Sequence, residues 1–102
     1  MQAKVARKLF LGFIQLHILR HAHAEPVYGA WLLRELLSHG YELSPGTLYP
    51  ILHGMEKDGL LEMKSRAVDG KLRKYYRCTE QGEAMLGLGK RKAEALLAEL
   101  RD

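Results

Sequence analysis

The sequence predicts a single, mainly α-helical domain that carries one short antiparallel β-hairpin. Three observations lead to this prediction. The chain of 102 residues has room for one domain. Apolar residues recur at helical spacing in four segments. The pair Asp69-Gly70 separates two short segments that we expect to be strands, and Asp-Gly is a strong signal for a hairpin turn.

The first expected helix spans residues 5–21 and is apolar on more than one face. A helix that is apolar on most sides is usually buried on most sides, so we expect a partner chain to cover part of it. Pro26 is expected to open the second helix, because its fixed φ suits a first turn. Gly40 lies where a left-handed residue would end that helix.

The third helix is expected to begin at Ser44-Pro45, with serine as the N-cap and proline as the first helical residue. Pro50 leaves two alternatives open. Either the helix begins at Pro45 and Pro50 kinks it, or Thr47 is the true cap and Pro50 lies in the first turn, where no hydrogen bond is lost. One apolar face is formed by Leu48, Ile51, Leu52 and Met55.

Two strands are expected over residues 60–66 and 72–78, with Tyr75 and Tyr76 on opposite faces. Thr79 is expected to cap a last helix. Three glycines within that helix each weaken it by about 1 kcal/mol relative to alanine. We therefore expect the last helix to need tertiary or quaternary support.

The order of these elements is typical of a winged helix-turn-helix. A short turn joins the second and third helices, and a basic hairpin follows directly. In this arrangement the third helix enters the major groove of DNA, and the hairpin, called the wing, contacts the phosphate backbone. The predicted fold class is therefore mainly α with a two-stranded β wing, flanked by an N-terminal and a C-terminal helix.

The net charge of +4 conceals two basic blocks. Residues 1–23 sum to +4, residues 24–63 to −4, residues 64–77 to +5 and residues 78–102 to −1. The second block contains six Lys and Arg residues and coincides with the expected wing. This distribution fits a phosphate-binding footprint, and a solvated hairpin is the alternative.

Four stretches of the sequence form a recognisable pattern: Pro26-Val27-Tyr28-Gly29, Ser44-Pro45-Gly46-Thr47-Leu48-Tyr49-Pro50, Asp58-Gly59-Leu60 and Arg73-Lys74-Tyr75-Tyr76-Arg77-Cys78-Thr79-Glu80-Gln81-Gly82. The seven-residue stretch from Ser44 and the run Arg73-Lys74-Tyr75-Tyr76-Arg77 are specific when they are taken together. In these stretches the chain resembles the PadR family of bacterial transcriptional regulators, over about residues 11–84, and its length suits the short-tailed subgroup. The resemblance implies a homodimeric winged-helix repressor whose C-terminal helix packs against the first helix of the partner. Ala30, His53 and Leu72 depart from the family pattern, which bears on affinity and base preference.

Contact with double-stranded DNA is expected from the third helix and the wing, at Ser44, Thr47, Tyr49, His53, Lys57, Lys71, Arg73 and Lys74. Hydroxyl groups at the front of a helix can bind a phosphate or a base edge, with simple capping as the alternative for Ser44 and Thr47. His53 and Lys57 either extend the contact or are solvated. Arg73 and Lys74 point to opposite faces of a strand, so only one of them is expected to meet DNA.

Dimerisation is expected to use apolar residues of the first and last helices, namely Leu9, Phe13, Leu86, Ala93, Leu96, Leu97 and Leu100. Residues 1–78 would then form the DNA-binding domain and residues 79–102 the dimerisation helix. Some short PadR relatives hold flat apolar ligands between their subunits with the help of a tryptophan on the last helix. Residues 79–102 contain no aromatic residue, which argues against the same site. Ordinary core and dimer packing is expected instead, and a small-molecule effector in a Phe-lined or Met85-lined pocket at the dimer interface is the alternative.

Several other classes of site are not expected. His17 and His21 are spaced for zinc on one helix face, but Glu25 is the only acid close to them in sequence, so we predict no metal site. The single cysteine, Cys78, excludes a disulfide framework and fits a cytoplasmic protein. No nucleophile has an evident partner base and no phosphate loop occurs, so we expect neither catalysis nor a cofactor. No apolar run is long enough to span a membrane.

The expected function is that of a DNA-binding transcriptional regulator, a repressor that binds a pseudo-palindromic operator as a homodimer. The alternative is a winged-helix dimerisation or adaptor module that binds another protein. The alternative draws on the low basic content of residues 44–58, where Lys57 is the only Lys or Arg.

Overall fold

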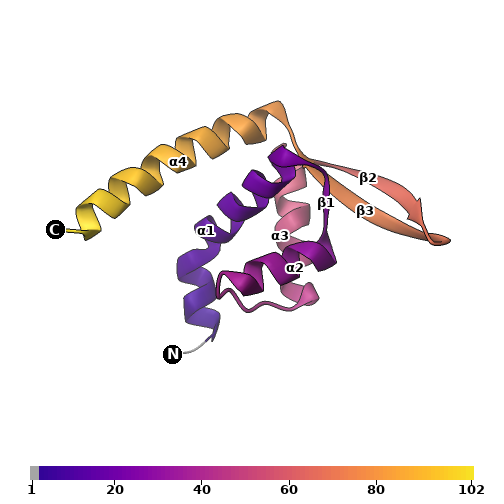
Figure 1. Cartoon of the computed structure of the whole chain (residues 1–102), viewed down its shortest axis with the longest axis horizontal. Coiled ribbons are helices and arrows are strands. Elements are labelled where there is room, and N and C mark those ends of the chain that lie inside the picture. The colour runs from indigo at the N-terminus through magenta and orange to yellow at the C-terminus, as the bar shows by residue number, and fades with distance from the viewer. Residues whose placement is uncertain (1–2) are drawn as a thin grey trace.

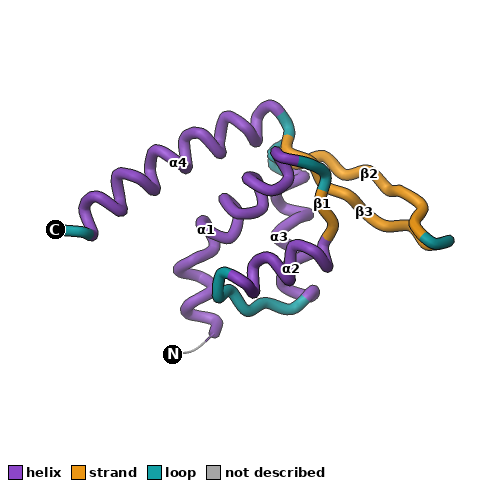
Figure 2. Tube along the Cα trace, viewed as in Figure 1, coloured by secondary structure: helices purple, strands orange, loops and turns teal. Residues whose placement is uncertain are grey.

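The computed structural model describes residues 3–102. These residues form α1 (Ala3–Ala24), β1 (Val27–Tyr28), α2 (Gly29–Ser38), α3 (Pro45–Lys57), β2 (Leu61–Val68), β3 (Lys71–Cys78) and α4 (Glu80–Leu100). The first three helices pack together, the β2–β3 hairpin projects from them on one side, and α4 extends away on the other (Figure 1). The same arrangement is clear in the Cα trace, where the hairpin stands apart from the helices (Figure 2). The predicted mainly helical architecture with an antiparallel hairpin is confirmed.

The prediction that Pro26 opens the second helix is wrong. The first helix continues three residues beyond its predicted end, and Val27–Tyr28 then form a short strand. Val27 pairs with Tyr76 and Tyr28 with Tyr75, so the sheet has three antiparallel strands in the order β1-β3-β2 instead of the predicted two. Valine and tyrosine favour strands, and a proline is tolerated beside an edge strand because the missing N–H costs no ladder bond there.

Helix α3 begins at the earlier of its two predicted starts. Ser44 is the N-cap and Pro45 the first helical residue, so Pro50 lies inside the helix. The Ser44 carbonyl oxygen accepts hydrogen bonds from the backbone N–H groups of Thr47 and Leu48, each at 3.0 Å. The Ser44 side chain caps no backbone group and instead lies 3.4 Å from the Thr47 hydroxyl, Oγ to Oγ1.

The two turns that flank this region follow their predicted chemistry. Gly40 ends α2 with a φ of 87°, and the hairpin turn places Asp69 at 52° and Gly70 at 77°. Positive φ at both central residues gives a two-residue hairpin the twist that its strands require. The Asp-Gly turn prediction is therefore confirmed.

The core lies where the first three helices meet the base of the sheet. Its largest fully buried side chains are Ile14, Ile18, Leu32, Leu36, Leu48, Leu52, Met55 and Tyr76. The predicted apolar face of α3 is confirmed, with Ile51 half-buried against this cluster. Within the described chain, no helix is long and apolar enough to cross a membrane.

Thr79 joins the start of α4 to the end of α3. Its hydroxyl oxygen accepts a hydrogen bond from the Gly82 N–H at 3.0 Å, as the predicted cap requires, and donates one to the Gly59 carbonyl oxygen at 2.6 Å. Gly82 packs so closely on the Leu60 carbonyl oxygen that no side chain would fit there. This junction sets the direction in which α4 leaves the domain.

Candidate nucleic-acid interface

The wing presents most of its positive charge on one face. Residues that pair across antiparallel strands share a face of the sheet. The β2–β3 register therefore groups Lys64, Arg66, Lys71, Arg73 and Arg77 on one face. Lys74 pairs with Ser65 on the opposite face, the face on which Tyr76 is buried. Arg73 and Lys74 thus lie on opposite faces, as the strand alternation predicts.

A groove of about 850 Å³ separates the wing from the helices. Strand β1 covers the outer edge of β3 only at Tyr75 and Tyr76, so the edge of β3 nearer the hairpin tip is free within the described chain. The groove borders this part of β3, and its lining includes Tyr28, Gly29 and Ala30 from the β1–α2 junction, Tyr49 and His53 from α3, and Lys71, Arg73 and Lys74 from the wing.

Two arginines on the basic face of the wing are held by tyrosines. The guanidinium carbon of Arg73 lies 4.1 Å from the centre of the Tyr28 ring, and that of Arg66 lies 4.5 Å from the centre of the Tyr75 ring. The two rings meet edge to face at 5.6 Å. A hydrogen bond with Tyr75 is the main cause that raises the pKa of Arg73 above its ordinary value.

Sequence reasoning missed the role of Tyr28 in this arrangement. The available signal was the alternation of basic and aromatic residues in β3, which placed Tyr75 on the same face as Arg73. Nothing in the sequence marked Tyr28 as a neighbour of Arg73 and Tyr75, because Pro26 predicts a helix where the short strand with Tyr28 forms.

Tyr49 is positioned by the absence of a side chain at Gly29. A Cβ at Gly29 would lie 2.5 Å from the Tyr49 hydroxyl oxygen and 2.8 Å from its Cζ. The Tyr49 ring therefore rests on the backbone where α2 begins, with the His53 ring one turn further along α3 and 6.4 Å away. Tyr49 is still 36% exposed, so its outer surface is open to the groove.

The structure brings together five of the eight predicted DNA-contact residues. Tyr49, His53, Lys71, Arg73 and Lys74 all line the groove. Thr47 is half-buried and Lys57 is exposed, and neither lines it. Ser44 instead borders a separate hollow of about 530 Å³ beside α2 and the start of α1.

The residues predicted for dimerisation form a largely exposed apolar surface on α1 and α4. Leu9 and Leu100 are each 70% exposed, and Phe13, Leu96 and Leu97 are also exposed. Between the two helices runs an apolar groove of about 410 Å³, whose lining includes Phe13, Ala93 and Leu96. Leu86 and Ala93 are half-buried, and Leu86 packs against the core of its own chain.

Comparison with known proteins gives consistent matches over this region. The family description "Transcriptional regulator PadR-like family" matches residues 18–88. The sequence is 52% identical over 87 residues to the transcriptional regulator Rv3488 of Mycobacterium tuberculosis, covering 85% of this chain and 81% of that protein.

Two solved structures extend this similarity to the fold. A PadR family transcriptional regulator from Eggerthella lenta has a TM-score of 0.81 and 30% identity, covering 95% of this chain and 86% of that chain. A PadR-like transcriptional regulator from Bacillus cereus has a TM-score of 0.78 and 32% identity, covering 93% and 91% of the two chains. The predicted winged-helix class is confirmed by these matches, and the matched residues include α3 and the wing.

Proposed function

Because the chain belongs to the PadR-like family of transcriptional regulators, a class that is not enzymatic, we propose that it represses transcription in the cytoplasm by binding a pseudo-palindromic DNA operator as a homodimer. The observation that carries this proposal is the groove in which Tyr49 and His53 of α3 face the basic wing. A helix in the major groove beside a basic hairpin on the phosphates is the docking geometry of this fold.

The two sides of the groove are suited to different contacts with DNA. Tyr49 and His53 carry groups that can meet base edges from α3, and Thr47 at the front of the helix extends this set. Lys71 next to the exposed hairpin tip and the Tyr28-held Arg73 supply charge for the sugar–phosphate backbone. Phosphate contacts set register and affinity, whereas base contacts set sequence preference.

The exposed apolar surface on α1 and α4 supports the homodimer. Surfaces of this kind mark contact sites, and α4 extends away from the domain (Figure 1) with Leu96, Leu97 and Leu100 exposed. In the proposed dimer, residues 1–78 bind DNA and residues 79–102 join the protomers. Two copies related by a twofold axis would place their α3 helices about 34–36 Å apart, over successive major grooves. The apolar groove between α1 and α4 is the place where a small apolar effector would bind.

The proposal is tested by a mobility shift with the DNA upstream of the encoding gene, together with sedimentation of the free protein. We expect a shifted complex and a mass of about twice 11.6 kDa. Lys71→Ala should weaken binding to all sequences alike, whereas Thr47→Ala should change the sequence preference. A folded dimer that shifts no DNA at low salt would contradict the proposal and favour an adaptor that binds another protein.

A further inference from the structure

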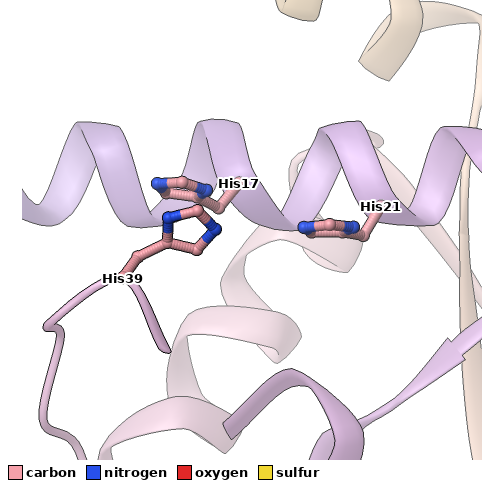
Figure 3. A group of neighbouring side chains, drawn as sticks. All are labelled: His17, His21 and His39. Atoms are coloured by element: carbon pink, nitrogen blue, oxygen red, sulfur yellow. The ribbon is translucent and has the colours of Figure 1, made fainter. Parts of the chain in front are cut away.

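Three histidines from two separate parts of the chain meet beside α1. His17 and His21 lie one turn apart on α1, and His39 follows the end of α2 (Figure 3). Each offers one ring nitrogen, and these nitrogens all lie within 4.8 Å of one another. The sequence suggested only the first two, because His39 is far from them along the chain.

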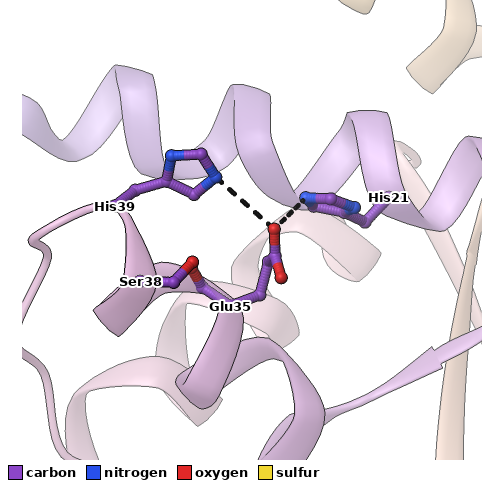
Figure 4. A network of polar contacts seen from close by, with 4 residues as sticks. All are labelled: His21, Glu35, Ser38 and His39. Atoms are coloured by element: carbon purple, nitrogen blue, oxygen red, sulfur yellow. Dashed lines mark hydrogen bonds and ion pairs between the residues drawn. The ribbon is translucent and has the colours of Figure 1, made fainter.

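A carboxylate lies against two of these three histidines. The Oε1 atom of Glu35 lies 3.4 Å from Nε2 of His21 and 3.4 Å from Nε2 of His39 (Figure 4). The prediction of no metal site rested on Glu25 as the only nearby acid, and the fold supplies Glu35 from α2 instead. The Ser38 hydroxyl donates a hydrogen bond to the backbone carbonyl oxygen of Glu35 at 2.6 Å. This bond lies in the last turn of α2 and leaves the Glu35 carboxylate free to face the histidines.

Neighbouring aromatic rings hold the imidazoles in place. Trp31 meets the His21 ring edge to face at 5.1 Å, and Tyr41 meets the His17 ring in the same way at 5.5 Å. The rings of His17 and His39 lie 4.4 Å apart. His17 and His21 are half-buried and His39 is exposed, so the cluster is open to solvent.

We propose that His17, His21, His39 and Glu35 form a binding site for a divalent metal ion of the zinc class. Imidazole nitrogen and carboxylate oxygen are ligands that zinc takes in a tetrahedral site, at about 2.0–2.2 Å. Such a site holds its ligand atoms about 3.4 Å apart, so the nitrogens need to approach by at most about 1.4 Å, which side-chain rotation supplies.

The chemistry of the ligand atoms limits which ions the site can bind. Three imidazoles disfavour Ca²⁺ and Mg²⁺, which take oxygen ligands, and the absence of a thiolate from the set disfavours Cu(I). Burial and the neighbouring histidines lower the pKa of His17, which favours the neutral form that binds metal. A bound ion would tie α1 to the end of α2 and so stabilise the folded chain.

The site is tested by titrating Zn²⁺ into the tag-free, chelator-treated protein in a calorimeter, with a thermal melt as a second measurement. We expect one ion per chain and a higher melting temperature with zinc. Loss of an outer-shell partner typically costs about 10–100-fold in metal affinity, so His39→Ala and Glu35→Gln, which each remove a ligand, should lower the affinity by at least that much. His23→Ala is the matched control, because His23 lies on the same helix but pairs with Glu83 outside the cluster.

Two results would overturn the proposal. One is a wild-type protein that takes up no stoichiometric zinc, and the other is a His39→Ala protein that binds zinc as tightly as His23→Ala does. Circular dichroism establishes that each variant is folded. If His39→Ala does not fold, His39→Gln puts the proposal to the same test. None of these measurements involves DNA, so failure of the metal site can be told apart from failure of the proposed repressor function.

Discussion

The contact between Gly29 and Tyr49 makes a prediction about DNA binding that can be worked from the structure. A Cβ added by Gly29→Ala would lie 2.5 Å from the Tyr49 hydroxyl oxygen, whereas ordinary contact begins at 3.4 Å. Tyr49 must therefore move by about 0.9 Å, and because the obstacle is the end of a side chain, it can swing away. We expect the stability cost to lie near the lower end of the 1–3 kcal/mol that overpacking usually costs.

The larger effect is expected in the affinity for DNA, because the swing takes the Tyr49 hydroxyl away from its place in the groove. Loss of one hydrogen bond worth about 0.5–1.5 kcal/mol weakens binding roughly 2- to 13-fold. Fluorescence anisotropy with an operator duplex measures this change. In a Tyr49→Ala background, Gly29→Ala should cause no further loss, because the obstacle is gone.

The double-mutant comparison also shows what would refute this reasoning. If Gly29→Ala weakens DNA binding by the same factor with and without Tyr49, the two residues act independently. Gly54→Ala is a control for stability, since a Cβ there meets no atom within 4 Å. That substitution should stabilise the fold by up to about 1 kcal/mol through helix propensity alone.

Three further predictions concern stability. Tyr76→Phe should stabilise the protein by about 1 kcal/mol in urea unfolding, because the buried Tyr76 hydroxyl has no hydrogen-bond partner in the described chain. A loss of stability would contradict this prediction and indicate that the hydroxyl has a partner. Thr79→Ala should cost about 1–2 kcal/mol, since it removes a cap to Gly82, and an unchanged urea midpoint would contradict that role. Burial, then His39 and His21, lower the pKa of His17 below 6.5, against an opposing effect of Glu35. The unfolded chain therefore binds the proton more readily, so stability should fall as the pH drops below about 6.5. In chelator, His17→Gln should lose less stability than the wild type between pH 7.5 and 5.5, and an equal loss would contradict this prediction.

Local chemistry made several features of the fold predictable. Asp69-Gly70 needs no distant partner to form its turn, and Thr79 caps a helix through a bond that spans three residues. The start of α3 at Ser44-Pro45 follows in the same way. Such signals act over a few residues, so they do not depend on how the rest of the chain packs.

Features that depend on distant neighbours were not predictable. Strand β1 has two residues, too few to show a period, and it exists because β3 offers an edge to pair with. The proposed metal site needs His39 beside His17 and Glu35 beside His21, and only the packing of α2 on α1 brings these residues together. The same holds for the groove, since charge patterning located the wing but not its distance from Tyr49.

The salt dependence of DNA binding tests the proposed dimeric, wing-clamped complex most directly. Each phosphate contact contributes about 0.9 to the slope of log affinity against log salt. A homodimer carries two copies of Lys71, so Lys71→Ala should reduce the slope by about 1.8 relative to the wild type. Affinity that does not change with salt, or a slope that Lys71→Ala leaves unaltered, would contradict the proposal that two basic wings grip the DNA backbone.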